Sequence, residues 1–350
     1  MQVDGLKCRD LLVAKMQPQY AYNEHKDYKA WREELKQKFM EVSGLEEMEK
    51  NISPDLNFEI EEEEQKDGYK QIRFTFESEI GAVVCAYILI PDNLKAGEKR
   101  PVVITLQGHS TGFHNSVGIV KYAERDIEYQ RTRGKFAVQA VQEGYIAVAI
   151  EQRGMGERAA KNQENRRVHL GNSSGCYYEA VTAGLLGRSI IGERCFDVRR
   201  TIDALAHFEN VCDLNKIVIT GNSGGGTISY YAACYDERIK ISVPSCAFCP
   251  YPDSILKFYH CSCNYIPNAF KYFDMQDLAC LIAPRQLALI NGQKDPSFLI
   301  EGARRGFETV KSIYKEAGAS DNCRLIENEE GHWWKVSTVW QTIKGELAKL

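Results

Sequence analysis

The sequence predicts one large α/β domain with a mostly parallel central sheet and helices on both faces. At 350 residues with 44% apolar content, the chain is long enough to bury a substantial core. Helix-like segments, among them 188–210 and 336–350, alternate with short apolar runs that are typical of buried strands. These runs lie at 101–106, 144–150, 216–220, 286–291 and 323–327.

The most informative stretch is Gly221-Asn222-Ser223-Gly224-Gly225, which matches the pattern G-x-S-x-G. An apolar strand at 216–220 precedes it and a helix-like segment at 226–234 follows it. This strand–turn–helix context is the one that a nucleophile elbow of an α/β-hydrolase requires. The two outer glycines leave room for the sharp turn that exposes the serine hydroxyl. Ser223 is therefore the predicted nucleophile.

A serine hydroxyl needs a base, and the base needs a group to orient it. His332 follows the predicted final strand at 323–327, and Asp295 lies in the turn after the strand at 286–291. This order of nucleophile, acid and histidine is that of α/β-hydrolases. We expect His332 to be the base and Asp295 its partner, with Asp253 and Asp274 as alternative acids.

An oxyanion that forms at the site needs backbone donors. We expect one to be the N–H of Gly224, directly after the nucleophile. The other is the N–H of His109, which follows the strand at 101–106 and the small residue Gly108. The side chain of His109 is expected either to contact substrate or to pack beside the site.

With these motifs, residues 80–350 resemble bacterial α/β-hydrolases of the acetyl xylan esterase and dienelactone hydrolase-like group. The resemblance implies a serine carboxylester hydrolase that acts on small acyl groups. The chain departs from the acetyl xylan esterases at Gly224, where they carry glutamine, and at Met155, where they carry the glutamine of an Arg-Gly-Gln triplet. It departs from the dienelactone enzymes by using serine instead of cysteine. The motifs that carry the resemblance are 107–109, 151–157, 197–200, 221–225, Asp295 and 331–332.

Domain organisation follows from the position of these motifs. Residues 1–55 are expected to form a helical arm, in which Trp31, Leu35 and Phe39 share one face. Residues 56–350 form the catalytic domain. It is led by antiparallel strands near 72–76 and 82–90, and the acidic run at 61–64 is expected at a solvated strand edge. Cap-like excursions are expected near 154–190 and 244–273.

The substrate pocket is predicted from residues near the strand ends and in the excursions. The candidates are His109, Arg153, Tyr178 and Phe248. For Arg153 an internal ion pair is favoured over a contact with a substrate carboxylate or sugar hydroxyl, and for the aromatic residues ordinary packing is the alternative.

No cofactor and no metal are expected, and the twelve cysteines are interpreted as reduced thiols. The alternative is a structural zinc held by Cys246, Cys249, Cys261 and Cys263, since four thiols within 18 residues could bind one tetrahedrally. Residues 1–20 lack a sustained apolar core, which favours a cytoplasmic location over a secretory one.

Net charge and hydropathy argue against two classes of binding partner, nucleic acids and membranes. A formal charge of −4 argues against a nucleic-acid footprint. Apolar runs such as 82–90 are too short to span a bilayer. The expected partner is therefore a small-molecule ester, and the sequence leaves open whether the chain forms a homo-oligomer.

Three function classes fit the motifs. The first is an esterase that removes short acyl groups, above all acetyl, from a small molecule or sugar through an acyl-serine intermediate. The second is a serine peptidase of the prolyl oligopeptidase type, which shares the order of the triad but has a propeller-like repeat that this chain lacks. The third is a non-catalytic binding protein on the same fold.

Overall fold

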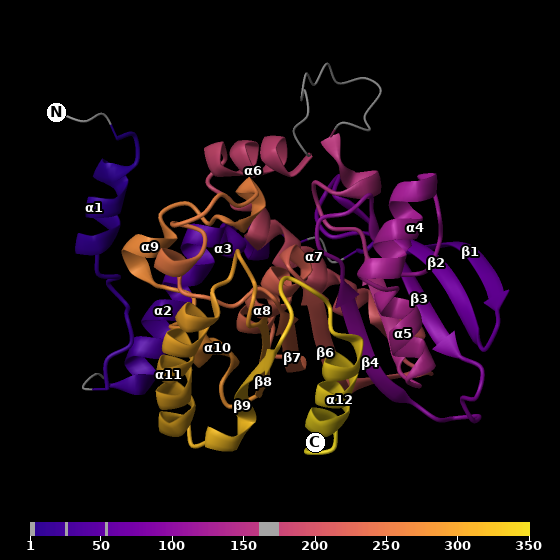
Figure 1. Cartoon of the computed structure of the whole chain (residues 1–350). Coiled ribbons are helices and arrows are strands. Elements are labelled where there is room, and N and C mark those ends of the chain that lie inside the picture. Colours follow the sequence, from indigo (N-terminus) through magenta and orange to yellow (C-terminus); the bar gives the residue numbers. More distant parts are fainter. Residues whose placement is uncertain (1–3, 25–26, 53–54, 161–174) are drawn as a thin grey trace.

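In the part of the chain that the structure describes, nine strands form one central sheet, in the order β1-β2-β3-β5-β4-β6-β7-β8-β9 (Figure 1). The computed structural model describes residues 4–24, 27–52, 55–160 and 175–350. The strands are β1 (Glu59–Lys66), β2 (Tyr69–Glu77), β3 (Val83–Pro91), β4 (Arg100–Leu106), β5 (Ile146–Ile150), β6 (Cys212–Asn222), β7 (Ile239–Ser245), β8 (Gln286–Gly292) and β9 (Cys323–Asn328).

The sheet has an antiparallel part and a parallel part. Strands β1, β2 and β3 are antiparallel neighbours, and β3 is antiparallel to β5. From β5 through β4, β6, β7 and β8 to β9 all pairs are parallel. The carboxyl ends of β4, β6, β8 and β9 therefore share one edge, where an open α/β sheet binds its ligands.

Helices cover both faces of this sheet (Figure 1). The α-helices of the described residues are α1 (Lys7–Lys15), α2 (Tyr28–Ser43), α3 (Leu45–Lys50), α4 (Ala123–Thr132), α5 (Phe136–Gln142), α6 (Gly175–Leu185), α7 (Ile190–Ala204), α8 (Gly224–Tyr235), α9 (Ala269–Tyr272), α10 (Ala279–Ile282), α11 (Ile300–Glu316) and α12 (Val336–Leu347).

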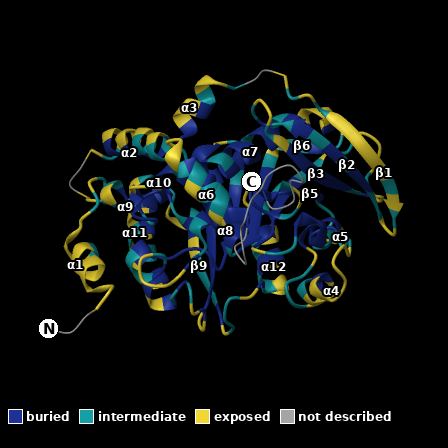
Figure 2. Ribbon diagram, turned by 90° about the horizontal axis from the view of Figure 1, so that it is seen from above, coloured by how far each residue is buried: buried dark blue, intermediate teal, exposed yellow. Residues whose placement is uncertain are grey.

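Two separate apolar cores result from the alternation of side chains along each strand. Ile217 and Ile219 pack into the core under α2, α7, α8, α10 and α11, whereas Val218 between them packs into the core under α5 and α12. The central strands are buried on both faces, while much of β1 and α1 is exposed (Figure 2). This arrangement explains why the parallel strands are continuous apolar runs in the sequence.

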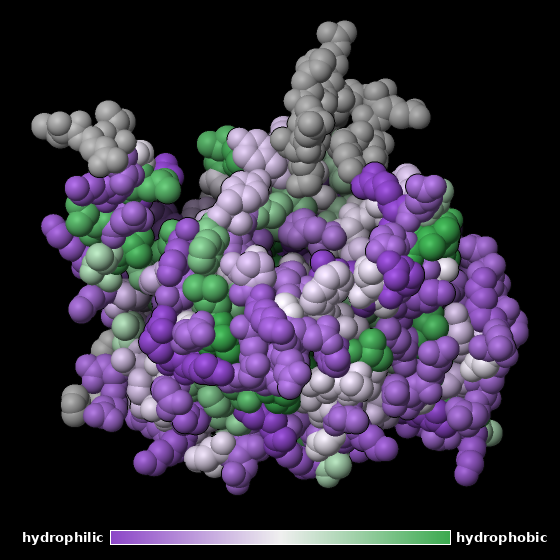
Figure 3. Space-filling view, viewed as in Figure 1, coloured by the Kyte–Doolittle hydropathy of each residue, from purple (hydrophilic) through white to green (hydrophobic). Residues whose placement is uncertain are grey.

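The N-terminal arm packs on the sheet domain through α2. Trp31, Leu35 and Phe39 are buried on one face of this helix, as the sequence predicts. The ring of Phe39 stacks on Tyr231 of α8 and meets Phe273 edge-on. By contrast, α1 has no buried residue, and apolar side chains gather on its surface (Figure 3).

Most of the helices and strands that the sequence predicts are present, but their first and last residues differ from the predicted ones. The acidic run at 61–64 lies in the exposed strand β1, and the helix expected over 188–210 is α7 with a single turn after it. Part of the excursion expected near 154–190 lies outside the described residues, at 161–174. Over the described part of the chain, no helix combines the length and the apolar character needed to cross a membrane.

The packing of α2 gives a stability prediction. We expect Leu35→Ala to lower the free energy of unfolding by about 2–5 kcal/mol, because the fully buried side chain leaves a cavity. Leu12→Ala on α1, where the side chain is 56% exposed, is the matched control and should change it by less than about 0.5 kcal/mol. Urea unfolding measures both; equal small effects would mean that the arm does not contribute to the core.

Candidate active site

Ser223 sits on a strained turn between β6 and α8. Its backbone has φ 57° and ψ −123°, a region that non-glycine residues rarely occupy. Strand β6 ends at Asn222 and α8 begins at Gly224. Such strain costs about 1–3 kcal/mol and persists only where the surroundings hold it in place.

Glycines make this turn sterically feasible. A Cβ atom at position 221 would lie 2.4 Å from the carbonyl oxygen of Leu106, and one at position 225 would lie 2.0 Å from the same oxygen. A Cβ at position 108 would lie 2.9 Å from the carbonyl oxygen of Asn222. The ends of β4 and β6 can therefore approach closely only because these three positions carry no side chain.

Asp295 and His332 form the contact that the sequence predicts. The Nδ1–H of His332 donates to Oδ2 of Asp295 at 2.7 Å. The other carboxylate oxygen accepts the backbone N–H groups of Ser297 and Phe298 at 2.8 and 3.1 Å. The carboxylate is thus fixed on both sides, and the imidazole that donates from Nδ1 is left with an acceptor at Nε2.

The loops that carry these two residues meet at another glycine. A Cβ at Gly292, the last residue of β8, would lie 2.0 Å from the carbonyl oxygen of Gly331. Because Gly292 has none, the chain after β9 can pass over the end of β8 and bring His332 to Asp295.

Ser223 and His332 line one cavity of about 170 Å³. The ring of Phe298 stacks on that of His332, with centroids 5.9 Å apart and an interplanar angle of 11°. The full lining is His109, Ser223, Tyr259, His260, Cys261, Asn264, Ser297, Phe298 and His332. The nucleophile and base candidates therefore open into the same small space.

A buried network braces the loop that carries His109. The side-chain amide of Gln107 donates to Glu151 at 3.1 Å, and that of Gln152 donates to the carbonyl oxygen of Gln107 at 2.7 Å. Glu151 also accepts the backbone N–H of Phe113. Burial raises the pKa of Glu151 to about 7.

The loop brings His109 to the start of α8. A Cβ at Gly224 would lie 3.3 Å from Cε1 of the His109 ring, so the two expected oxyanion residues are neighbours. The N–H of Gly224 is among the first four of α8, and such groups have no partner within their own helix.

The structure places Arg153 away from the cavity, in an internal ion-pair network. Its guanidinium lies 2.8 Å from Glu79, 3.0 Å from Asp197 and 3.4 Å from Glu193. Burial raises the pKa of Asp197, but the nearby Arg153 and Arg158 outweigh it and hold this pKa at about 2. Arg153 is therefore removed from the pocket candidates, and the internal ion pair that the sequence favours is the observed arrangement.

The two aromatic pocket candidates also lie elsewhere. Phe248 is buried in the core beside Tyr230 of α8, with ring centroids 5.9 Å apart. Tyr178 lies on α6 and is not among the lining residues. Aromatic composition alone could not separate core from pocket, because both environments favour these side chains.

Sequence reasoning missed several lining residues. They are His260, Asn264, Ser297 and Phe298. The first two come from the excursion predicted near 244–273, and the other two lie two and three residues after Asp295. Ser297 and Phe298 could have been predicted as lining residues, because they lie close in sequence to the predicted catalytic residue Asp295.

The four cysteines considered as zinc ligands are not brought together. Cys261 and Cys263 lie beside Cys176 and His109, whereas Cys246 lies beside Asp295 and His332. The thiol of Cys249 contacts the carbonyl oxygen of Leu299. Burial raises the pKa of Cys246 and of Cys249 to about 12, so both are neutral thiols.

The fold and the serine turn are those of an α/β-hydrolase. The chain belongs to the Abhydrolase family, whose model matches residues 7–330. A curated relative, "Putative hydrolase YtaP" of Bacillus subtilis (strain 168), is 26% identical over 242 residues, which cover 67% of this chain and 74% of YtaP.

Solved structures share the fold at low sequence identity. A "putative acetyl xylan esterase" from Bacteroides fragilis NCTC 9343 matches with a TM-score of 0.75 and 20% identity, over 94% of this chain and 83% of that one. A glucuronoyl esterase from Solibacter usitatus matches with a TM-score of 0.65 and 15% identity, over 96% and 98%.

The ion pairs of Arg153 predict that this residue contributes to the stability of the fold and not to substrate binding. We expect Arg153→Met to destabilise the fold by about 3–5 kcal/mol, because it leaves buried carboxylates without their cation. The KM of the folded fraction for an ester should stay unchanged. Arg131→Met, which removes an exposed ion pair to Glu128, is the control and should cost less than about 1 kcal/mol. If Arg153→Met instead raised KM and left the stability unchanged, Arg153 would have to be a pocket residue.

Proposed function

We propose that the protein is a serine carboxylester hydrolase that cleaves short acyl esters, above all acetyl esters, of a small molecule or sugar. The observation that carries the proposal is the meeting of Ser223, on its strained turn, with the hydrogen-bonded pair of His332 and Asp295 at one cavity. The names of the solved structures that share the fold, acetyl xylan and glucuronoyl esterases, support an ester as the substrate.

In the proposed acylation step, Nε2 of His332 removes the proton from the Ser223 hydroxyl as its oxygen attacks the ester carbonyl. Asp295 stabilises the imidazolium that forms. The N–H groups of His109 and Gly224 donate to the oxyanion of the tetrahedral intermediate. The intermediate collapses when the C–O bond to the alcohol breaks, and His332 returns the proton to the departing alcohol.

Deacylation repeats these roles with water. His332 takes a proton from a water molecule that attacks the acyl carbon of Ser223. The second tetrahedral intermediate releases the carboxylic acid, and the serine oxygen recovers its proton from His332. Each residue ends in its starting protonation state, so no cofactor is required for turnover.

The roles of the nucleophile and its base partner can be tested by substitution. We expect Ser223→Ala to lower kcat for p-nitrophenyl acetate by several orders of magnitude with the fold intact, and Asp295→Asn to lower it by about 10⁴-fold through the wrong imidazole tautomer. Ser312→Ala, on the exposed face of α11, is the matched control. A Ser223→Ala protein that keeps more than about a tenth of wild-type turnover would exclude this serine, since the loss would be under 1.4 kcal/mol.

The size of the cavity predicts selectivity for short acyl groups. A methylene contributes only about 0.8 kcal/mol of binding, so the preference must come from steric exclusion by the side chains around the serine. We expect acetate and propionate esters to be cleaved faster than the octanoate ester of the same alcohol, by kcat/KM. Equal or faster cleavage of the octanoate ester would contradict the deacetylase assignment and indicate an open, lipase-like groove.

The competing classes predict different outcomes in the same assay. A peptidase of the prolyl oligopeptidase type would cleave a proline peptide anilide in preference to p-nitrophenyl acetate. A binding protein would turn over neither compound.

A further inference from the structure

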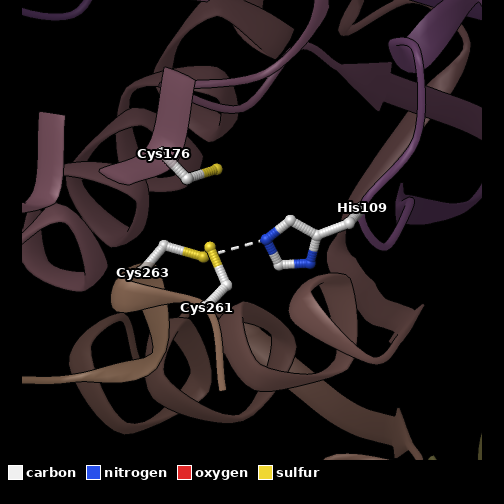
Figure 4. A group of neighbouring side chains, drawn as sticks. All are labelled: His109, Cys176, Cys261 and Cys263. Carbon is white, nitrogen blue, oxygen red and sulfur yellow. Dashed lines mark hydrogen bonds between the residues drawn. The ribbon is translucent and has the colours of Figure 1, made fainter. Parts of the chain in front are cut away.

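Three segments that are distant in the chain bring one imidazole and three thiols together beside the cavity (Figure 4). His109 comes from the loop after β4, Cys176 from the start of α6, and Cys261 and Cys263 from around the short turn at Ser262–Asn264. One nitrogen and three sulfur atoms lie within 4.8 Å of one another, and His109 Nε2 is 3.1 Å from Cys263 Sγ.

We propose that these four side chains form a closed, structural site for a thiophilic divalent cation, with Zn²⁺ as the ion. Three cysteines and one histidine are a donor set of structural zinc sites. With Zn–S bonds near 2.3 Å and Zn–N bonds near 2.0 Å, tetrahedral ligand atoms lie about 3.6–3.8 Å apart. The four ligand atoms all lie within 4.8 Å of one another, and the His109–Cys263 pair is 3.1 Å apart. Small side-chain rotations therefore suffice to bring all four atoms to one ion.

The surroundings also fit the charge of such a site. Three thiolates and one Zn²⁺ carry a net charge of −1. Arg194 is buried, at 1% exposure, and its Nη2 lies 3.2 Å from Cys176 Sγ. Its guanidinium also donates to the carbonyl oxygen of Arg153 at 3.0 and 2.5 Å. A buried guanidinium directed at a sulfur ligand neutralises the site and orients that ligand, as partners of metal ligands commonly do.

The local backbone holds the two neighbouring cysteines in a shape that suits one ion. The backbone N–H and the side-chain amide of Asn264 both donate to the carbonyl oxygen of Cys261, at 3.0 and 3.1 Å. This closes a tight turn, and the thiols of Cys261 and Cys263 both face His109. The hydroxyl of Ser262 donates to the carbonyl oxygen of Cys176 at 3.3 Å, which fastens the turn to α6.

The role of the ion follows from what its ligands connect. His109 belongs to the loop proposed to donate to the oxyanion, and Cys261 lines the cavity. A fully ligated ion has no open position for substrate. It therefore fixes the excursion of 244–273 and α6 against the His109 loop and shapes the cavity, while the chemistry stays with Ser223. Only this positioning role rests on the proposed function.

The test measures metal content in purified, reduced protein. We expect one zinc per chain by elemental analysis in the wild type, and less than about a tenth of that in Cys261→Ser and Cys263→Ser. Cys249→Ser is the matched control, because Cys249 is a buried cysteine outside the cluster, and it should keep its zinc. Near-ultraviolet circular dichroism establishes that each variant is folded. In the Co²⁺-exchanged wild type we expect thiolate-to-cobalt charge-transfer bands and a tetrahedral d–d spectrum.

Further variants separate the metal site from the catalytic proposal. Ser223→Ala should bind zinc as the wild type does, so its metal content is independent of turnover. Arg194→Met, if folded, should bind zinc about 10–100-fold more weakly in a chelator competition. Folded, reduced wild type that neither retains zinc nor takes up added Zn²⁺ or Co²⁺ would overturn the proposal. So would a disulfide within the cluster in freshly isolated protein, or loss of zinc in Cys249→Ser but not in Cys261→Ser.

Discussion

The backbone at Ser223 has to turn from a buried strand into a helix within one residue, with a φ that an L-amino acid rarely adopts. The turn is possible because Gly221 and Gly225 let it press against the carbonyl oxygen of Leu106 at the end of β4. Gly108 in turn lets the next loop lie against Asn222. One packing constraint between two neighbouring strands therefore sets the position of the half-buried Ser223, of the His109 loop and of the start of α8.

The rest of the site is assembled at the same edge of the sheet. Parallel strands deliver Asp295 after β8 and His332 after β9, and Gly292 allows their loops to cross. The buried carboxylate of Glu151 accepts hydrogen bonds from the side chain of Gln107 and the backbone N–H of Phe113, both in the segment that follows β4. These hydrogen bonds stabilise the loop that carries His109. The strand ends thus determine where the site residues lie, and buried hydrogen bonds determine how these residues are oriented.

Features that depend on local sequence could be predicted, and the fold class with its mostly parallel sheet is confirmed. The serine turn could be located because strand, glycine spacing and helix are contiguous. The contact between Asp295 and His332 could be expected because chain order in this fold determines which loops meet. Strand ends and helix bounds shifted by a few residues, as in α7, because final-turn geometry depends on packing and not on composition.

Features that depend on packing between distant segments could not be predicted. For Arg153 the sequence favours an internal ion pair, but it does not identify the three carboxylates from other segments that bind its guanidinium. For the alternative zinc site, the sequence predicts Cys246 and Cys249 as the partners of Cys261 and Cys263, because these four cysteines lie close together in the chain. The spatial partners of Cys261 and Cys263 are Cys176 and His109, which lie more than eighty residues away in sequence. Neither the spacing of the cysteines nor the hydropathy of the sequence predicts that these distant residues come together.

The central claim is that the strained turn makes Ser223 the reactive nucleophile of this chain. Its most direct test is covalent labelling with a fluorophosphonate, in which the serine oxygen forms a bond to phosphorus and fluoride departs. Peptide mapping by mass spectrometry then locates the adduct. We expect a single adduct on Ser223, formed rapidly in native protein and abolished by unfolding in urea. An adduct on another residue of the folded protein, or none at all, would contradict it.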